Sequence, residues 1–200
     1  MPESHTPQRP LILGSTSRYR RELVERLNLP FTTVSPDVDE TPLPGEAPGT
    51  LALRLALAKA HAVAALHPEA IVIGSDQVSD LHGQPMGKPG THERAVEMLR
   101  AMRGQTVMFH TAVAVVCQAT GFAQSDVAVI RTVFRSDLSD DAIERYLRAE
   151  QPYDCAGSAK SEGLGISLLD AIHSDDPTAL IGLPMIRTCR MVRAAGIALP

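Results

Sequence analysis

Residues 11–24 read LILGSTSRYRRELV, and this stretch decides how the fold begins. The apolar run Leu11–Leu13 predicts a short buried strand, and the Gly-Ser-Thr-Ser segment after it predicts a tight turn. Ser17 is a residue type that caps helices, and Leu23 falls on the buried side of a helix that runs to about Asn28. A strand, a turn and a helix in this order indicate the opening unit of an α/β fold.

The rest of the chain continues this alternation of strands and helices. Further strands are predicted at residues 31–34, 70–73, 106–117, 126–134 and 166–169. Helices are predicted at residues 50–66 and 92–102, from about 139 to a point before Pro152, and from about Pro184 onward. The two long β-rich runs on either side of Gly121 favour an antiparallel pair. We therefore expect an α/β fold, with a single domain over residues 11–200 and a mixed β-sheet flanked by helices.

Composition and charge exclude several classes of protein. The chain has 200 residues, 44% hydrophobic and 21% charged, with a net charge of −4 that argues against a nucleic-acid partner. No run approaches the ~20 apolar residues of a membrane span, and residues 1–10 are a polar, Pro-rich stretch that we interpret as a loose leader rather than a signal peptide. Three widely spaced cysteines form no CxxC pair, which favours a reducing cytoplasm.

Four polar clusters follow strands, where ligands bind in open α/β sheets. They are residues 14–21, 39–40, 74–77 and 87–89. In the first, serine hydroxyls and helix N-terminal N–H groups suit an oxyanion, and the arginines oppose the positive end of the helix dipole unless polyphosphate is bound. The alternative is a plain serine cap with solvated arginines, and the GxxxxGK phosphate motif is absent.

Carboxylates and lysines in the other clusters are candidates for a metal and phosphate site. Asp76 comes directly after the apolar run IVIGS, so it is either a metal ligand or base, or a loop residue bonded to backbone. Asp39 and Glu40 suit Mg²⁺ or Mn²⁺, and the alternative is an acidic pair solvated in a Pro-rich loop. Lys59 lies among alanines in a predicted helix, and Lys88 lies in a Gly-Lys-Pro loop.

Together these segments resemble the Maf family of nucleoside triphosphate pyrophosphatases, from Leu11 to about Arg193. The resemblance rests on LILGSTSRYRRELV, VSPDVDET, LRLALAKA, IVIGSDQV, GKP, CAGSAKSEGLGI and GLPM, in this order. It implies an elongated, Maf/ITPase-like mixed sheet. IVIGSDQV and CAGSAKSEGLGI resemble the branch that acts on 7-methyl-GTP, since the dTTP/UTP branch usually has Thr after the Asp. The family commonly has Pro where Arg18 stands, and the branch often has Trp where Tyr19 stands.

The resemblance also implies an activity and a set of site residues. The implied reaction is hydrolysis of a nucleoside triphosphate to the monophosphate and pyrophosphate, which would remove modified nucleotides from the pool. The phosphate and metal site would consist of Ser15, Arg20, Asp39, Glu40, Lys59, Asp76 and Lys88, with Asp76 as general base and Mg²⁺ or Mn²⁺ as cofactor. Tyr19, Gln77 and Glu162 fall on positions linked to base specificity. The resemblance also favours a homodimer.

Elementary chemistry supports the 7-methyl-GTP branch, although other functions stay open. The methylated guanine carries a positive charge, which favours stacking on an aromatic ring such as Tyr19. Its N1–H and N2–H₂ are adjacent donors that one carboxylate, such as Glu162, can accept together; the alternative for Glu162 is a solvated loop acid. The alternatives are the same reaction on dTTP, UTP or another triphosphate, and a nucleotide-binding regulator of cell division without turnover.

Overall fold

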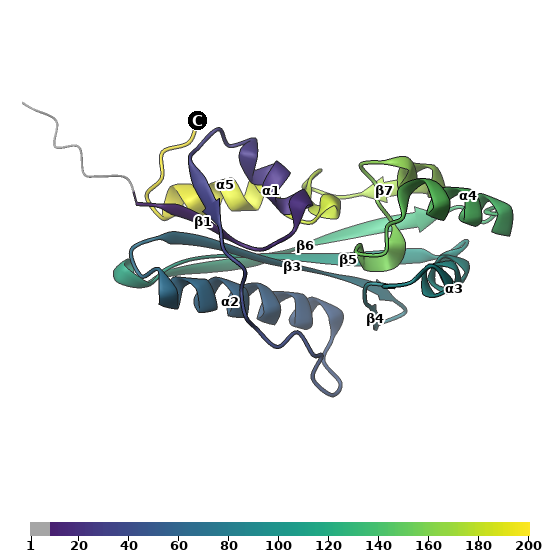
Figure 1. Cartoon of the computed structure of the whole chain (residues 1–200), viewed down its shortest axis with the longest axis horizontal. Helices are drawn as coiled ribbons and strands as arrows, with labels where there is room; N and C mark the ends of the chain where they lie inside the picture. The colour runs from purple at the N-terminus through teal and green to yellow at the C-terminus, as the bar shows by residue number, and fades with distance from the viewer. Residues whose placement is uncertain (1–8) are drawn as a thin grey trace, which may run out of the picture.

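A mixed sheet of seven strands extends along the length of the molecule (Figure 1). The computed structural model describes residues 9–200. The strands are β1 (Leu11–Gly14), β2 (Phe31–Thr33), β3 (Ile71–Leu81), β4 (Gln84–Met86), β5 (Thr106–Cys117), β6 (Phe122–Phe134) and β7 (Leu169–His173). Their order is β2-β1-β3-β5-β6-β7, and β4 pairs with β3 beside this path. The prediction of an α/β fold with a mixed, elongated sheet is confirmed.

The strand β3 joins a parallel half of the sheet to an antiparallel half. It pairs parallel with β1 from Leu11↔Ile71 to Gly14↔Gly74, and antiparallel with β5 as far as Asp80. The prediction that this strand ends at residue 73 was wrong, because the polar residues after it keep pairing with β5. Because β1 stops beside Gly74 and β4 pairs only with Ser79–Leu81, residues 75–78 of β3 have no neighbouring strand on this edge. The residues of that edge are available for a binding site.

Helices cover both faces of the sheet (Figure 1). One face carries α2 (Pro48–Leu66), and the other carries α1 (Arg18–Glu25) and α5 (Met185–Ala194). The remaining helices, α3 (His92–Met102) and α4 (Asp140–Glu150), lie at the far end of the sheet. Gly74 allows α2 to pass close to β3, since a Cβ at this residue would lie 2.4 Å from the carbonyl oxygen of Ala56.

Most predicted elements are confirmed, with shifted ends. Ser17 caps α1, which ends at Glu25, and the antiparallel pair of β5 and β6 is present, with β6 beginning at Phe122. The strand predicted at residues 166–169 was wrong, since residues 164–168 form a 3₁₀ helix in which the hydroxyl of Ser167 donates to the carbonyl of Leu164. Strand β7 begins only at Leu169.

By length and composition α2 alone, within residues 9–200, would be able to cross a membrane. Its buried residues, among them Leu55, Ala56, Ala60 and Val63, pack against apolar side chains of the sheet. We therefore assign α2 to the core. The predicted leader at residues 1–10 lies almost entirely outside the described residues.

Candidate active site

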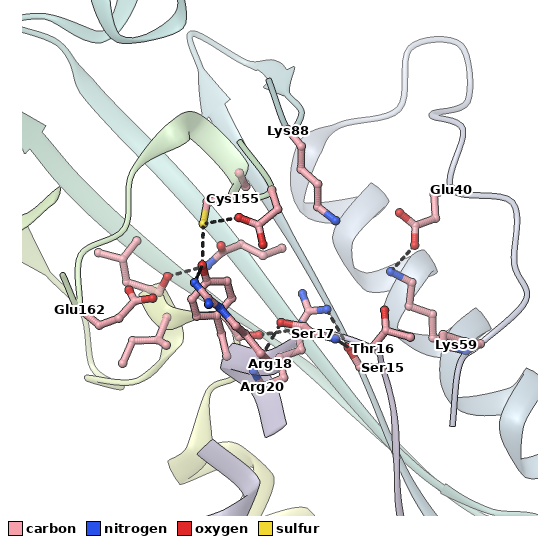
Figure 2. A pocket seen from close by; sticks show the side chains of 18 of the residues that line it. Ser15, Thr16, Ser17, Arg18, Arg20, Glu40, Lys59, Lys88, Cys155 and Glu162 are labelled. Atoms are coloured by element: carbon pink, nitrogen blue, oxygen red, sulfur yellow. Dashed lines mark hydrogen bonds and ion pairs between the residues drawn. The ribbon is translucent and has the colours of Figure 1, made fainter. Parts of the chain in front are cut away.

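A pocket of about 440 Å³ opens at the point where β1 stops and β3 continues. Figure 2 shows Lys59, Glu40 and Lys88 on one side of it, and Cys155 and Glu162 on the other. The wall is formed by residues 15–20 after β1, by Glu40 and Lys59, by the segment 154–162, and by residues 180–182 before α5. Segments that are far apart in the sequence therefore meet around one cavity.

The alternation of side chains along β3 determines which residues face each side of the pocket. Asp76 lies two residues after Gly74, so both point toward α2. On α2, Lys59 lies one turn from Leu55 and one turn from Val63, which places it on the buried face of the helix. Ser75 and Gln77 point to the opposite face, toward the segment before α5. The strand thus contributes a carboxylate to one face and neutral polar groups to the other.

The centre of the charged side is the ammonium group of Lys59. Its Nζ lies 2.6 Å from Oδ1 of Asp76 and 2.6 Å from Oε1 of Glu40. The side chains of Lys59 and Asp76 are only 7% and 10% exposed, whereas that of Glu40 is 55% exposed. Burial opposes the charge of Glu40, but the hydrogen bond and the charge of Lys59 leave the pKa of its carboxyl below the usual value. One cation therefore pairs with two carboxylates, and these three groups together carry a net negative charge.

Arg20 connects the serine-rich turn to this charged group. Its Nε donates to the carbonyl of Gly182 over 2.9 Å, and its Nη1 lies 3.5 Å from Oγ of Ser15. Burial lowers the pKa of Arg20, while the charges of Asp76 and Glu40 act in the opposite direction. The guanidinium is therefore positioned by backbone on one side and lies in the field of two carboxylates on the other.

The other end of the pocket contains an aromatic ring and a carboxylate. The guanidinium of Arg18 lies over the ring of Tyr19, 4.7 Å from its centroid, and Arg18 Nη2 donates to the phenol oxygen over 2.8 Å. Burial raises the pKa of Tyr19 to about 12, so the phenol is neutral at physiological pH. Partial burial also raises the pKa of Glu162 above the usual value, an effect that Lys160 opposes.

Gln77 has a fixed amide orientation. Its Nε2 donates to Oγ1 of Thr111 over 2.9 Å and lies 3.1 and 3.0 Å from the carbonyl oxygens of Ala179 and Leu180. Three acceptors around the nitrogen leave the amide oxygen as the group that Gln77 presents to a ligand.

Of the predicted site residues, Ser15, Tyr19, Arg20, Glu40, Lys59, Gln77, Lys88 and Glu162 all line the pocket. Asp76 is not among the lining residues, but its side chain is 10% exposed and contacts Lys59, which does line the pocket. Asp39 does not join them, because its Oδ1 accepts the N–H of Thr41 over 2.9 Å within its own exposed loop.

Comparison with known proteins identifies the family of this chain. A family model described as "Maf-like protein" matches residues 10–195. The chain belongs to the Maf-like family.

Relatives of this Maf-like chain carry a common name. It is 71% identical to the 7-methyl-GTP pyrophosphatase of a Polaromonas species, over 96% of this chain and 87% of the relative. It is 67% identical to the 7-methyl-GTP pyrophosphatase of Albidiferax ferrireducens, over 95% of both chains. A protein of the same name from Aromatoleum aromaticum is 60% identical, over 95% of this chain and 97% of the relative. The predicted resemblance to the Maf family and to this branch is confirmed.

The donor set of the Maf-like pocket fits a divalent cation that arrives with its substrate. Within residues 9–200 no three His, Cys, Asp or Glu side chains gather as a complete metal cage. Glu40 and Asp76 nevertheless converge on one point, which the ammonium of Lys59 shares. Mg²⁺ is usually bound through one or two carboxylates together with substrate phosphates and waters. Two carboxylates beside a pocket that is also lined by Arg20 and Lys88 meet that requirement.

Several residues of the Maf-like pocket were not found by reasoning from the sequence. Arg18 lies in the predicted cluster at residues 14–21 and Cys155 in the landmark CAGSAKSEGLGI, but neither had an assigned role, and residues 180–182 contribute mainly through their backbone. The residue type does not show which backbone carbonyls will line a site. For residues 180–182 the available signal was the GLPM landmark at residues 182–185, which carried no assigned role.

Proposed function

We propose that this Maf-like protein hydrolyses 7-methyl-GTP to 7-methyl-GMP and pyrophosphate by attack of water on the α-phosphorus. The observation that carries the proposal is one pocket with two chemically distinct ends, a charged end around Lys59 and a base-sized end around Tyr19 and Glu162. The names of the relatives at 60–71% identity support the same substrate. Removal of a modified nucleotide from the pool would be the consequence.

The charged end suits a triphosphate. Phosphoryl and nucleotidyl transfer depend mainly on positioning and on neutralisation of charge. Arg20, Lys59 and Lys88 provide three cations along the pocket, and the hydroxyl of Ser15 adds a hydrogen-bonding group beside Arg20. In the proposed complex these groups bind the phosphate oxygens. Binding of the base at the other end of the pocket then fixes the position of the α-phosphorus relative to the attacking water.

Asp76 and Glu40 would activate the attacking water and hold Mg²⁺ or Mn²⁺. Such an ion, when bound, makes its water more acidic and neutralises phosphate charge. Lys59 Nζ contacts Oδ1 of Asp76, and the second oxygen of that carboxylate is the one that can accept a proton from water. Proton transfer to Asp76 as general base is thus compatible with its ion pair.

The base end suits a cationic purine. A methylated guanine stacked on Tyr19 would replace the guanidinium of Arg18 on the ring and keep a cation–π attraction, worth about 1–2 kcal/mol when desolvated. Glu162 would accept N1–H and N2–H₂, and the oxygen of Gln77 would offer a further acceptor. Uracil and thymine present no such pair of adjacent donors.

We infer the compartment and the kind of partner from the cysteines and the net charge. Cys117, Cys155 and Cys189 are free thiols, which supports a reducing cytoplasm. The net charge of −4 supports a small-molecule partner rather than nucleic acid. Homodimers are the most common soluble assembly, and light scattering on the purified protein would test whether this one is a dimer.

A panel of nucleoside triphosphates with Mg²⁺ or Mn²⁺, read as pyrophosphate release, tests the proposal. We expect the highest kcat/KM for 7-methyl-GTP, and a selective loss on this substrate in Glu162→Gln. Higher activity on dTTP or UTP, with equal losses in the variant, would support the alternative substrates. Nucleotide binding without release of pyrophosphate would support a regulator without turnover.

A further inference from the structure

The segment that carries Glu162 is tied to α4 on both sides of that residue. The phenol of Tyr146 donates to the carbonyl of Ser158 over 2.9 Å and accepts the N–H of Lys160 over 3.0 Å. Glu150, the last residue of α4, accepts the N–H of Leu164 over 2.7 Å. The base end of the pocket is therefore built on contacts from a helix that does not itself line the pocket.

Glu150 also binds the cation nearest to the base end. Its Oε2 accepts from Nζ of Lys160 over 2.9 Å, and the two side chains are only 16% and 21% exposed. The packing is tight, since a Cβ on Gly163 would lie 2.6 Å from Oε1 of Glu150. Both oxygens of this carboxylate are thus engaged, one by the backbone of the loop and one by Lys160.

The charge of Lys160 acts on both groups that would recognise the base. Its Nζ is 6.0 Å from the centroid of the Tyr19 ring. Its charge also lowers the pKa of Glu162, whereas the charge of Glu150 raises it. A free ammonium here would pair with the Glu162 carboxylate and repel a positively charged base. Arg18 lies over the same ring, but its side chain is exposed and can leave for solvent.

We infer that Glu150 is a positioning residue for base recognition, because it binds the ammonium of Lys160 6.0 Å from the centre of the Tyr19 ring and balances its charge, so that this ammonium neither pairs with Glu162 nor repels a cationic base. The inference rests on the proposed function and adds a specific requirement to it. Glu150 does not touch the nucleotide, and its influence passes through Lys160. Loss of its charge should therefore reduce the preference for the methylated base while the reaction at the phosphates is unaffected.

A charge-removal cycle tests this role. Glu150→Gln keeps the shape and the acceptor for Leu164 but releases Lys160, and it should lower the ratio of kcat/KM for 7-methyl-GTP over GTP about three- to tenfold, with kcat on GTP unchanged. Lys160→Gln should keep or raise the ratio, and the double variant should recover most of it. Glu144→Gln is the matched control, since Glu144 lies on the same helix and pairs with His92 and Arg148.

A structural role for Glu150 would give a different pattern. Equal losses on both nucleotides, or a loss that persists in the double variant, would overturn the inference. If Glu150→Gln does not fold, a lower ratio in Lys160→Gln alone would overturn it too. Calorimetric binding of 7-methyl-GMP and GMP measures base recognition without turnover. The proposed function is tested separately, because a wild-type protein that cleaves no triphosphate would refute it whatever the binding results. Equal affinity of the wild type for both monophosphates would refute the inference.

Discussion

Asp76→Asn separates a catalytic role of this carboxylate from a structural one. The substitution keeps the shape of the side chain and removes the charge that faces Lys59 over 2.6 Å. Complete loss of a partner by a buried ion costs about 3–5 kcal/mol. Lys59 keeps Glu40 at 2.6 Å, so the expected loss of unfolding free energy is smaller, about 1–2 kcal/mol.

That loss of stability is too small to mimic a catalytic defect. A domain of this kind has about 5–15 kcal/mol of stability, so a loss of about 2 kcal/mol leaves nearly all molecules folded at 25 °C. Removal of a general base or a metal ligand, by contrast, reduces turnover about 100-fold or more, equivalent to about 2.7 kcal/mol in the activation free energy. The two explanations therefore predict different turnover.

The assay is pyrophosphate release at saturating 7-methyl-GTP and Mg²⁺, with thermal unfolding of the same samples. Asp137→Asn is the control, because Asp137 is 74% exposed and pairs with Arg135 away from the pocket. We expect the control to behave as wild type. Turnover of Asp76→Asn within about threefold of wild type would refute a role for this carboxylate in the chemistry.

Three further outcomes are expected. Gly74→Ala should lower the unfolding free energy by about 3 kcal/mol or more, measured by denaturant titration, because its Cβ would lie 2.4 Å from the carbonyl oxygen of Ala56; an unchanged midpoint would contradict the close packing of α2 on β3. The hydrogen bond from Arg54 lowers the pKa of Glu46 from 4.5 to about 2, so its stabilisation is present above pH 4.5 and is lost as the pH falls toward 2. Glu46→Gln should flatten the acid side of the stability curve in that range, and an unchanged curve would count against the ion pair. Arg18→Gln should lower KM for 7-methyl-GTP about two- to fivefold, because a competing cation leaves the aromatic ring, and a higher KM would show instead that Arg18 helps to bind the nucleotide.

Local chemistry allowed much of the fold and part of the site to be predicted. Ser17 and the strand before it were identified because capping and burial depend on neighbouring residues. Lys59 was identified as unusual among alanines, and its burial explains why, since a charged group on the apolar face of α2 requires buried partners.

The misplaced elements depend on distant parts of the chain. The end of β3 could not be located, because polar residues such as Ser75 and Gln77 continue the strand only when β5 pairs beside them. The separation of Asp39 from Glu40 depends on a turn in which Asp39 accepts the N–H of Thr41, and adjacent residues of one loop can point either way. Tertiary pairing and loop conformation decide such details, and neither is encoded in residue type alone.

The segment of residues 179–182 has a consequence for the timing of synthesis. Its carbonyl groups accept hydrogen bonds from Arg20, Ser75 and Gln77, which come from the first half of the chain. Those three residues leave the ribosome long before residues 179–182 are synthesised. A nascent chain can therefore pair its first strands while the carbonyl groups that orient Arg20 are still missing. Polypeptides that end before residue 179 would therefore lack these acceptors and with them a competent pocket.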